Sequence, residues 1–191
     1  MRSFAQIISI FFSPLTFIPL MVFFKFQQMH FSPAQWYLTG GIIVMLGIVP
    51  IVTTLAVFKY VGLISDWGIA NRRQRHLFGA IAIAWGGITT WVLFQLQFSE
   101  LGLFLLWLVG GNIIFSAITL FWKISAHTAA VTLFSLFTIY VYGALWLSLL
   151  LIIFTVAWAR MLLKKHTPAQ VLAGIALGIS LFWIGREVGW I

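Results

Sequence analysis

The sequence has no cysteine and only three acidic residues, and charged residues make up 7% of its 191 positions. Without cysteine there can be no disulfide, no thiolate nucleophile and no thiolate metal site. Soluble domains carry about a quarter charged residues, so these charges are too few to cover a surface in water. The 62% content of hydrophobic residues instead predicts an integral membrane protein. The net charge of +8 is therefore attributed to a membrane, and nucleic acid is excluded as a partner.

The few charged residues divide the chain into apolar stretches that are long enough to cross a bilayer. For example, 22 uncharged positions lie between Arg2 and Lys25, and another 22 between Glu100 and Lys123. An α-helix rises about 1.5 Å per residue and needs about 20 residues to cross a hydrocarbon core of about 30 Å. We therefore predict an all-α fold, a polytopic transmembrane helical bundle with six to seven spans in a single integral membrane domain, residues 1–191. The predicted helices are 3–24, 36–58, 77–98, 101–122, 127–142, 144–163 and 168–186.

The number of spans depends on the uncharged segment 124–159, which is too long for one straight crossing and short for two. Gly143 is the most favourable position for a turn within it. A turn there gives seven spans and places His127 and His166 on the same side of the membrane. A single long tilted helix gives six spans and places them on opposite sides.

The N-terminal apolar run is predicted to be a retained first span, not a cleaved signal. It extends over about 22 residues, includes Pro14 and Pro19, and ends at Lys25 without a small-residue cleavage site. Small residues allow membrane helices to approach closely. We therefore also predict close helix contacts at three glycine pairs inside the spans, which are Gly40-Gly41, Gly86-Gly87 and Gly110-Gly111.

Basic residues gather on one side of the seven-span arrangement. That side receives nine of them, whereas the other receives Lys25 and Arg186. Four of the nine are assigned below to a functional site and could bias this count. Without them, five basic residues remain on this side against two on the other. The positive-inside rule therefore predicts that this face is cytoplasmic. We expect a multi-pass protein of a bacterial or archaeal cytoplasmic membrane. The nine residues are Arg2, Lys59, Arg72, Arg73, Arg75, Lys123, Arg160, Lys164 and Lys165.

Three segments that carry basic or imidazole groups end on this same face. Ionisable residues at span ends are costly and indicate a functional site. Cationic side chains together with helix N-termini form an anion site, and the anion typical of a bilayer surface is a phosphate. The candidate residues are Arg72, Arg75, Lys123, His127, Arg160 and His166.

The spacing of these residues resembles that of the type 2 phosphatidic acid phosphatase superfamily. Its third signature, Ser-Arg, five residues, His, three residues, Asp, is similar to the segment 159–170, with Arg160 and His166 in register. Its second signature, Pro-Ser-Gly-His, is similar to Ile124-Ser125-Ala126-His127. Its first signature, Lys, six residues, Arg-Pro, is matched by Arg75 alone, since Gly68 and His76 hold its Lys and Pro positions. The three segments follow the family order, and the resemblance covers roughly residues 60–187.

The resemblance implies a metal-free mechanism without a cofactor. His166 would attack phosphorus to form a phosphohistidine, and His127 would protonate the leaving alkoxide and later activate water. Arg75 and Arg160 would stabilise the charge on the non-bridging oxygens. The signature Lys that is missing at Gly68 is expected to be replaced by Arg72, one helical turn before Arg75, or by Lys123, four residues before His127. Ser125 is also expected to contact the phosphate. Lys123 is equally well explained as an interfacial lysine, and Ser125 is also expected to cap the fifth span.

The main departure from the family pattern is Gln170, which stands where the signature has Asp. An amide oxygen can accept a hydrogen bond from the Nδ1–H of His166 but brings no charge. We expect reduced activity, or a role shared with Asp66 in orienting the histidine. The segment Thr167-Pro168-Ala169-Gln170 is also typical of a capping box with Pro at the first helical position.

The sequence thus predicts a membrane lipid-phosphate phosphatase, a hydrolase of phosphate monoesters or pyrophosphates. Expected partners are membrane lipids, and candidate substrates are phosphatidic acid, phosphatidylglycerol phosphate and polyprenyl phosphates. One alternative is a lipid phosphotransferase of the same fold. The other is a catalytically weakened protein that binds or transports lipid phosphates.

Overall fold

A computed structural model describes residues 1–67, 69 and 71–191. Within these residues every regular element is a helix, as the composition predicts. The chain forms two compact units, one made of residues 1–24 with 121–189 and the other of residues 25–120. The first unit is therefore discontinuous in sequence, because it joins the start of the chain to its C-terminal third.

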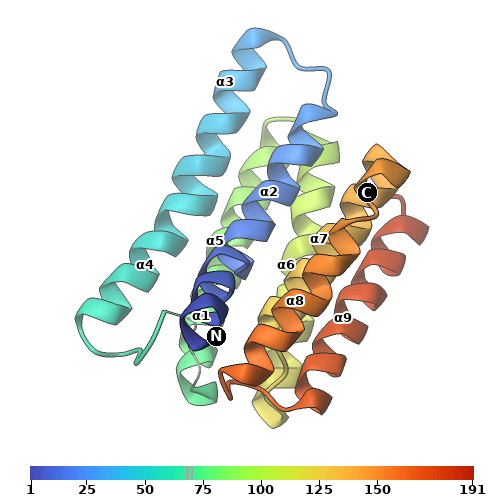
Figure 1. The fold of residues 1–191 in the computed structure, drawn as a ribbon. Helices are drawn as coiled ribbons and strands as arrows, with labels where there is room; N and C mark the ends of the chain where they lie inside the picture. Colours follow the sequence, from blue (N-terminus) through green and yellow to red (C-terminus); the bar gives the residue numbers. More distant parts are fainter. Residues whose placement is uncertain (68, 70) are drawn as a thin grey trace. The chain divides into compact units, whose positions relative to one another are not determined.

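The first unit contains α1 (Arg2–Phe11), most of α2 (Pro14–Gln27), α7 (Ala126–Tyr142), α8 (Leu149–Leu162) and α9 (Pro168–Glu187). Helices α8 and α9 both pack against α7, and α1 packs against α8 (Figure 1). Helix α7 ends at Tyr142 and is followed by Gly143, whose φ of 87° is a conformation that other residues rarely adopt. A short 3₁₀ turn, Ala144–Trp146, then leads into α8. The predicted turn at Gly143 is confirmed, and the alternative of one long helix over 124–159 is wrong.

The predicted first helix, 3–24, is in fact two helices. Pro14 has no N–H to donate to the carbonyl four residues before it, and it disfavours the helical conformation at Ser13. Helix α1 therefore ends at Phe11 and α2 begins at Pro14, where the fixed φ of proline suits the first helical position. Pro19, by contrast, lies inside α2.

The second unit contains α3 (Pro33–Ile42), α4 (Val49–Tyr60), α5 (Arg72–Gln95) and α6 (Ser99–Phe121, to Leu120 in this unit). A π-helical segment, Ile43–Ile48, joins α3 and α4 into one long helix. Helix α5 starts five residues earlier than the predicted 77–98. The reason is Asn71, whose side chain accepts a hydrogen bond from the N–H of Arg73 and caps the helix.

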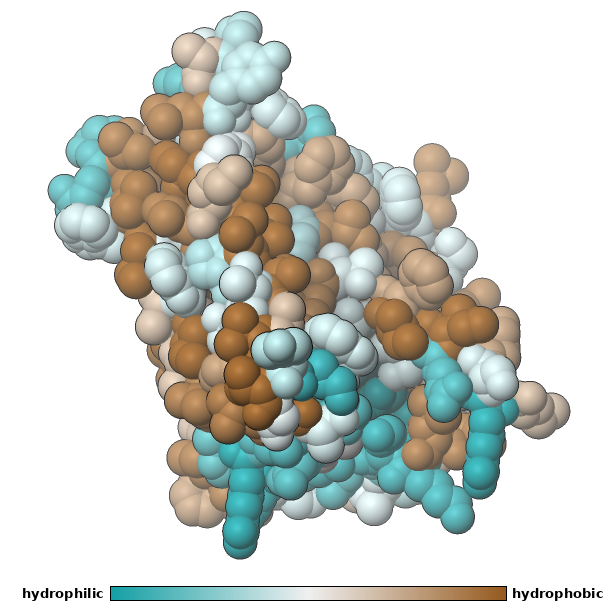
Figure 2. Space-filling view, turned by 90° about the vertical axis from the view of Figure 1, so that its left-hand side faces the viewer, coloured by the Kyte–Doolittle hydropathy of each residue, from teal (hydrophilic) through white to brown (hydrophobic). Residues whose placement is uncertain are grey.

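Within the part of the chain that the structure describes, six helical segments are long and apolar enough to cross a membrane, and α7 is a shorter apolar helix of 17 residues. The six are Arg2–Gln27, Pro33–Tyr60, Arg72–Gln95, Ser99–Phe121, Ala144–Leu162 and Pro168–Glu187. Figure 2 shows hydrophobic side chains over most of the face on view, as expected for a surface in contact with lipid. The chain is an integral membrane protein with an all-α polytopic bundle fold.

The closest helix contact of the first unit is between α7 and α9. A Cβ added at Gly178 would lie 2.6 Å from the carbonyl oxygen of Ala129, and one added at Gly174 would lie 2.5 Å from that of Ser125. Glycine at these two positions, four residues apart on one face of α9, lets the two backbones touch. Of the three predicted glycine pairs, Gly86-Gly87 is confirmed as a close helix contact through Gly86, whereas a Cβ at Gly41, Gly87 or Gly110 would meet nothing within 4 Å. A Cβ added at Gly86 would lie 2.7 Å from Cγ2 of Val109 in α6.

Candidate active site

The start of α7, the end of α8 and the start of α9 meet at one end of the first unit. The chain reverses direction at Gly143, so α7 and α8 are antiparallel. His127, at the start of α7, therefore lies at the same end of the unit as Arg160, near the end of α8. A tight loop follows α8, with Lys164 in the left-handed conformation at a φ of 54°. The loop places His166 two residues before α9. His127, Arg160 and His166 are all buried, with 3–6% of their surface exposed.

Backbone contacts fix the start of α7 against the start of α9. The N–H of Ser125 donates to the carbonyl of Gln170 over 3.1 Å, and the hydroxyl of Thr128 donates to the carbonyl of Val171 over 3.1 Å. These two hydrogen bonds lie beside the close approach at Gly174. The positions of His127 and His166 therefore depend on the same helix interface.

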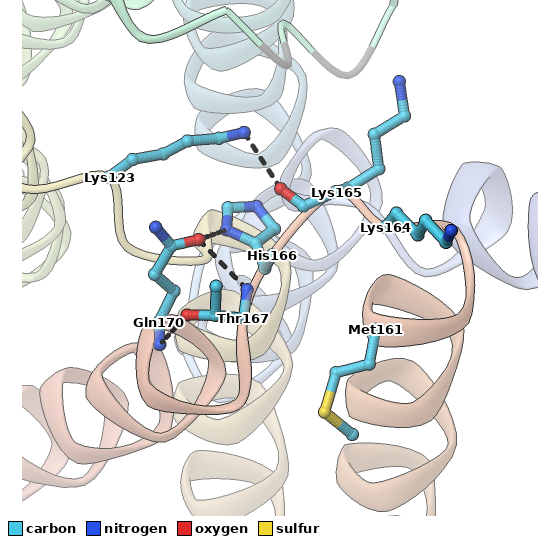
Figure 3. Close-up of a pocket in the computed structure, with 7 residues that line it drawn as sticks. All are labelled: Lys123, Met161, Lys164, Lys165, His166, Thr167 and Gln170. Atoms are coloured by element: carbon cyan, nitrogen blue, oxygen red, sulfur yellow. Dashed lines mark hydrogen bonds between the residues drawn. The ribbon is translucent and has the colours of Figure 1, made fainter.

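His166 is held by the residue that replaces the family Asp. Its Nδ1 lies 3.3 Å from Oε1 of Gln170 (Figure 3). An amide oxygen can only accept, so this contact places the ring proton on Nδ1 and makes Nε2 the basic nitrogen. The same oxygen also accepts the N–H of Thr167, while the Thr167 hydroxyl accepts the N–H of Gln170. The predicted capping box is thus formed together with the contact to His166.

An open pocket of about 320 Å³ lies beside His166. Lys123 extends over it, and its ammonium group donates to the carbonyl of Lys165 over 2.9 Å (Figure 3). The side chains of Lys164 and Lys165 point away from His166. This pocket combines an imidazole with cationic groups, a combination suited to an anion. Its lining residues are Lys123, Met161, Lys164, Lys165, His166, Thr167 and Gln170.

His127 and Arg160 both contact Ser9 of α1. Nε2 of His127 lies 3.0 Å from the carbonyl oxygen of Ser9, and Nη1 of Arg160 donates to the Ser9 hydroxyl. Nothing in the sequence marked Ser9 as part of a site. The available signal was indirect, namely Pro14, which ends α1 shortly after Ser9.

Ser125 caps α7 as expected. Its hydroxyl accepts the N–H of Thr128 over 3.3 Å, and the residue is fully buried. A phosphate contact by Ser125 stays a prediction, as does one by Lys123.

Three further predicted site residues belong to the second unit. Arg75 is buried, its Nε donates to the carbonyl of Ile69 over 2.7 Å, and it interacts electrostatically with Asp66. Arg72 donates to the carbonyl of Leu120. The assignment of Arg75, Arg72 and Asp66 to the site stays a prediction. Gly68, the position of the family Lys, lies outside the described residues.

Across residues 1–67, 69 and 71–191, no cluster of three or more His, Asp or Glu side chains offers a ligand set for a metal ion. The site residues near one another in the first unit are instead two histidines, an arginine and lysines, a donor set suited to binding an anion.

Comparison with known proteins identifies the segment that carries this site. No curated protein and no solved structure matches the chain. A sequence model of the PAP2 superfamily matches residues 116–190, which include both histidines, Arg160 and Gln170. The match begins later than the resemblance predicted from about residue 60, so Arg75 lies outside it. Residues 116–190 are thus similar to the PAP2 superfamily, the type 2 phosphatidic acid phosphatases, and this match supports the resemblance found in the sequence.

Proposed function

We propose that this protein is a lipid-phosphate phosphatase that hydrolyses a phosphate monoester or pyrophosphate of a lipid through a phosphohistidine on His166. Members of the PAP2 superfamily are phosphatases, so the match over residues 116–190 supports phosphatase-type activity in general. The observation that carries the specific proposal is the contact between Nδ1 of His166 and Gln170 beside the open pocket. It orients Nε2 as a nucleophile, which is the role of His in the third signature.

The first half of the proposed reaction forms the phosphoenzyme. Nε2 of His166 attacks phosphorus in line, the P–N bond forms, and the bond from phosphorus to the ester oxygen breaks. His127 gives its proton to the departing oxygen, so the lipid leaves as an alcohol or, from a pyrophosphate, as a monophosphate. Arg160 stabilises the charge on the non-bridging oxygens, the main contribution in phosphoryl transfer.

The second half releases inorganic phosphate. Water attacks phosphorus, the P–N bond breaks, and His127 takes the proton that water loses. One water is consumed in the whole cycle, and both histidines return to their starting protonation states. Arg75 would add positive charge around the phosphate, as the signature order implies, and Arg72 or Lys123 would take the place of the missing signature Lys. Each half needs an acid or a base and cationic groups, so the reaction needs no metal.

A lipid is the proposed substrate because the pocket belongs to helices that the composition places in a membrane. The headgroup would reach the pocket while the acyl or prenyl chains remain in the bilayer. Phosphatidic acid, phosphatidylglycerol phosphate and polyprenyl phosphates or diphosphates all satisfy this requirement. We propose that the site faces the cytoplasm, on the charge asymmetry of the chain.

Gln170 favours a second candidate function. Without the negative charge of the family Asp, the positive charge that develops on His166 is less well stabilised. A protein that binds or transports lipid phosphates without turnover would show the same pocket and the same capping box. A phosphotransferase would form the same phosphohistidine but pass the phosphoryl group to a lipid alcohol.

The test is phosphate release by the purified protein from a panel of phospholipid and prenyl phosphates in detergent with EDTA. His166→Ala and His127→Ala should each abolish release, whereas His30→Ala, an exposed histidine of the second unit, should leave it unchanged. A ³²P-labelled substrate should give a label on the wild-type protein that is stable in base and labile in acid.

The outcomes separate the candidates. Release that requires both histidines and survives EDTA supports the proposal, and an added lipid alcohol that captures the phosphoryl group favours the phosphotransferase. Binding of phosphate lipids without release by wild type would refute the phosphatase and leave the binding protein. Release that is lost in EDTA would contradict the metal-free mechanism.

A further inference from the structure

The two catalytic groups proposed on α7 and α8 meet on a single residue of α1. Ser9 offers two oxygens, its carbonyl to Nε2 of His127 at 3.0 Å and its hydroxyl to Nη1 of Arg160. These contacts bridge 118 and 151 positions of sequence. No other step of the mechanism above makes use of Ser9, and the matched family segment, residues 116–190, does not contain it.

The availability of the Ser9 carbonyl follows from the break in the first span. In an uninterrupted helix this oxygen would accept the N–H of Ser13, four residues later. Pro14 disfavours the helical conformation at Ser13, so α1 ends at Phe11. The last carbonyls of a helix need partners from outside it. His127 supplies one, and the contact is a consequence of the proline.

Helix α1 is held firmly enough to act as a support. Its buried face, Ala5 and Ile8, is at most 5% exposed, and Phe4 packs against Trp158 of α8 with ring centroids 6.5 Å apart. Ser9 lies one residue beyond Ile8 and four beyond Ala5, at the edge of this face. Its two oxygens are therefore fixed by the packing of α1 on α8.

We propose that Ser9 is a positioning residue of the active site, which holds His127 in one tautomer through its carbonyl and orients Arg160 through its hydroxyl. The proposal rests on the phosphatase function proposed above. A carbonyl cannot donate, so the contact requires the proton of neutral His127 to be on Nε2. Nδ1 is then the nitrogen that exchanges a proton with the leaving oxygen and with water.

The contact to Arg160 uses a small part of that side chain. A guanidinium has five N–H donors in a fixed planar fork, and Ser9 accepts from one of them. The hydrogen bond from Nη1 fixes the plane of the guanidinium group, so the group is already oriented toward the phosphate before substrate binds. Preorganised donors of this kind contribute more to the transition state than donors that must reorient.

The hydroxyl is tested by Ser9→Ala, with Ser3→Ala on the exposed face of α1 as the matched control. A hydrogen bond to a charged group accounts for roughly 10-fold in rate. We expect kcat to fall about 10-fold in Ser9→Ala with KM changed by less than about two-fold. Ser9→Thr keeps a hydroxyl and should recover most of the loss. Ser3→Ala should behave as wild type.

The carbonyl is tested by Pro14→Ala, with Pro19→Ala as the matched control in the same helix. Alanine at position 14 allows α1 to continue into α2. The N–H of Ser13 would then donate to the Ser9 carbonyl, and the hydrogen bond from His127 to that carbonyl would be lost. The tautomer of His127 is read by ¹⁵N NMR of histidine-labelled protein in detergent at a pH where imidazole is neutral. His127→Gln identifies its signals among the four histidines. We expect the Nε2–H form in wild type and in Pro19→Ala, and a mixture of tautomers in Pro14→Ala.

The NMR measurement separates this proposal from the phosphatase proposal, because it needs no turnover. A wild type that releases no phosphate refutes the phosphatase, and the His127 tautomer still decides the Ser9 contact. The proposal is overturned by an Nδ1–H form in wild type, or by a tautomer that Pro14→Ala does not alter. It is also overturned if Ser9→Ala lowers KM without lowering kcat. That result would mean that Ser9 competes with the substrate phosphate and does not support the groups that bind it.

Discussion

Gly174→Ala is expected to damage the site without changing any residue proposed to act in it. The added methyl would lie 2.5 Å from the carbonyl oxygen of Ser125 and would also collide with the hydroxyl of Thr128. Unlike the end of a long side chain, the Ser125 carbonyl is backbone and cannot rotate aside. Helices α7 and α9 must therefore separate by roughly 1 Å to restore an ordinary contact of about 3.5 Å.

The expected loss of stability follows from three contributions. Overpacking of this kind typically costs about 1–3 kcal/mol. Separation of the helices also lengthens the hydrogen bond from Thr128 to Val171, which is worth about 1 kcal/mol. Alanine returns up to about 1 kcal/mol through its higher helix propensity. The net loss is therefore about 1–3 kcal/mol.

The effect on activity should be larger than the effect on stability. The bond between Ser125 and Gln170 joins the segments that carry His127 and His166, so a shift of α9 changes the distance between the two histidines. A misplacement of about 1 Å can lower a rate about 100-fold. We expect kcat for phosphate release to fall by about that factor at a temperature where the variant is still folded.

The assay compares thermal unfolding in detergent and phosphate release for Gly174→Ala and Gly110→Ala. Gly110 is also helical, but a methyl there would meet nothing within 4 Å. The control should therefore be as stable as wild type or slightly more stable, with unchanged activity. If both variants unfold and turn over like wild type, the close approach of α7 and α9 does not set the geometry of the site.

Three other variants test separate features. Gln170→Glu keeps the contact to His166 and adds a negative charge beside it, so kcat should rise about 10-fold. An unchanged or lower kcat would show that the missing negative charge does not limit the reaction. Gly143→Ala forces a side chain into a conformation with φ of 87° and should cost about 1–3 kcal/mol in thermal unfolding. Glu100→Gln removes the partner of Lys25, whose side chain is 8% exposed, and should destabilise the protein more than the double variant with Lys25→Met. Equal melting temperatures would contradict this last expectation.

Most of the fold could be predicted because the membrane imposes it. Gaps of 20 or more uncharged residues predict spans, and every span found lies in such a gap, apart from charged residues at its ends and Lys25. Gly143 could be predicted as the turn because a positive φ favours glycine. The start of α5 was missed, since Asn71 caps a helix whose first turn is strongly basic and therefore resembles a loop.

The contacts that support the candidate site could be predicted less well. His127, Arg160 and His166 stand out through their chemistry and spacing, but Ser9 is an ordinary serine in an apolar segment. Its role depends on which helix packs beside α1, and no local pattern encodes that choice. The close glycine contacts of α9 could not be predicted for the same reason. Gly174 and Gly178 are close to α7 because α9 turns that face toward it, whereas a Cβ at Gly87 or Gly110 would meet nothing within 4 Å.

The discontinuous first unit has a consequence for biosynthesis. Its first 24 residues leave the ribosome 96 residues before position 121, where the rest of the unit begins. At a synthesis rate of about 5–20 residues per second, this delay is roughly 5–20 s. During that time Ser9 cannot contact His127 or Arg160, because neither residue has yet been translated. The N-terminal helix is therefore translated well before the other helices of its own unit, and the candidate site can form only after residues 121–189 have followed it.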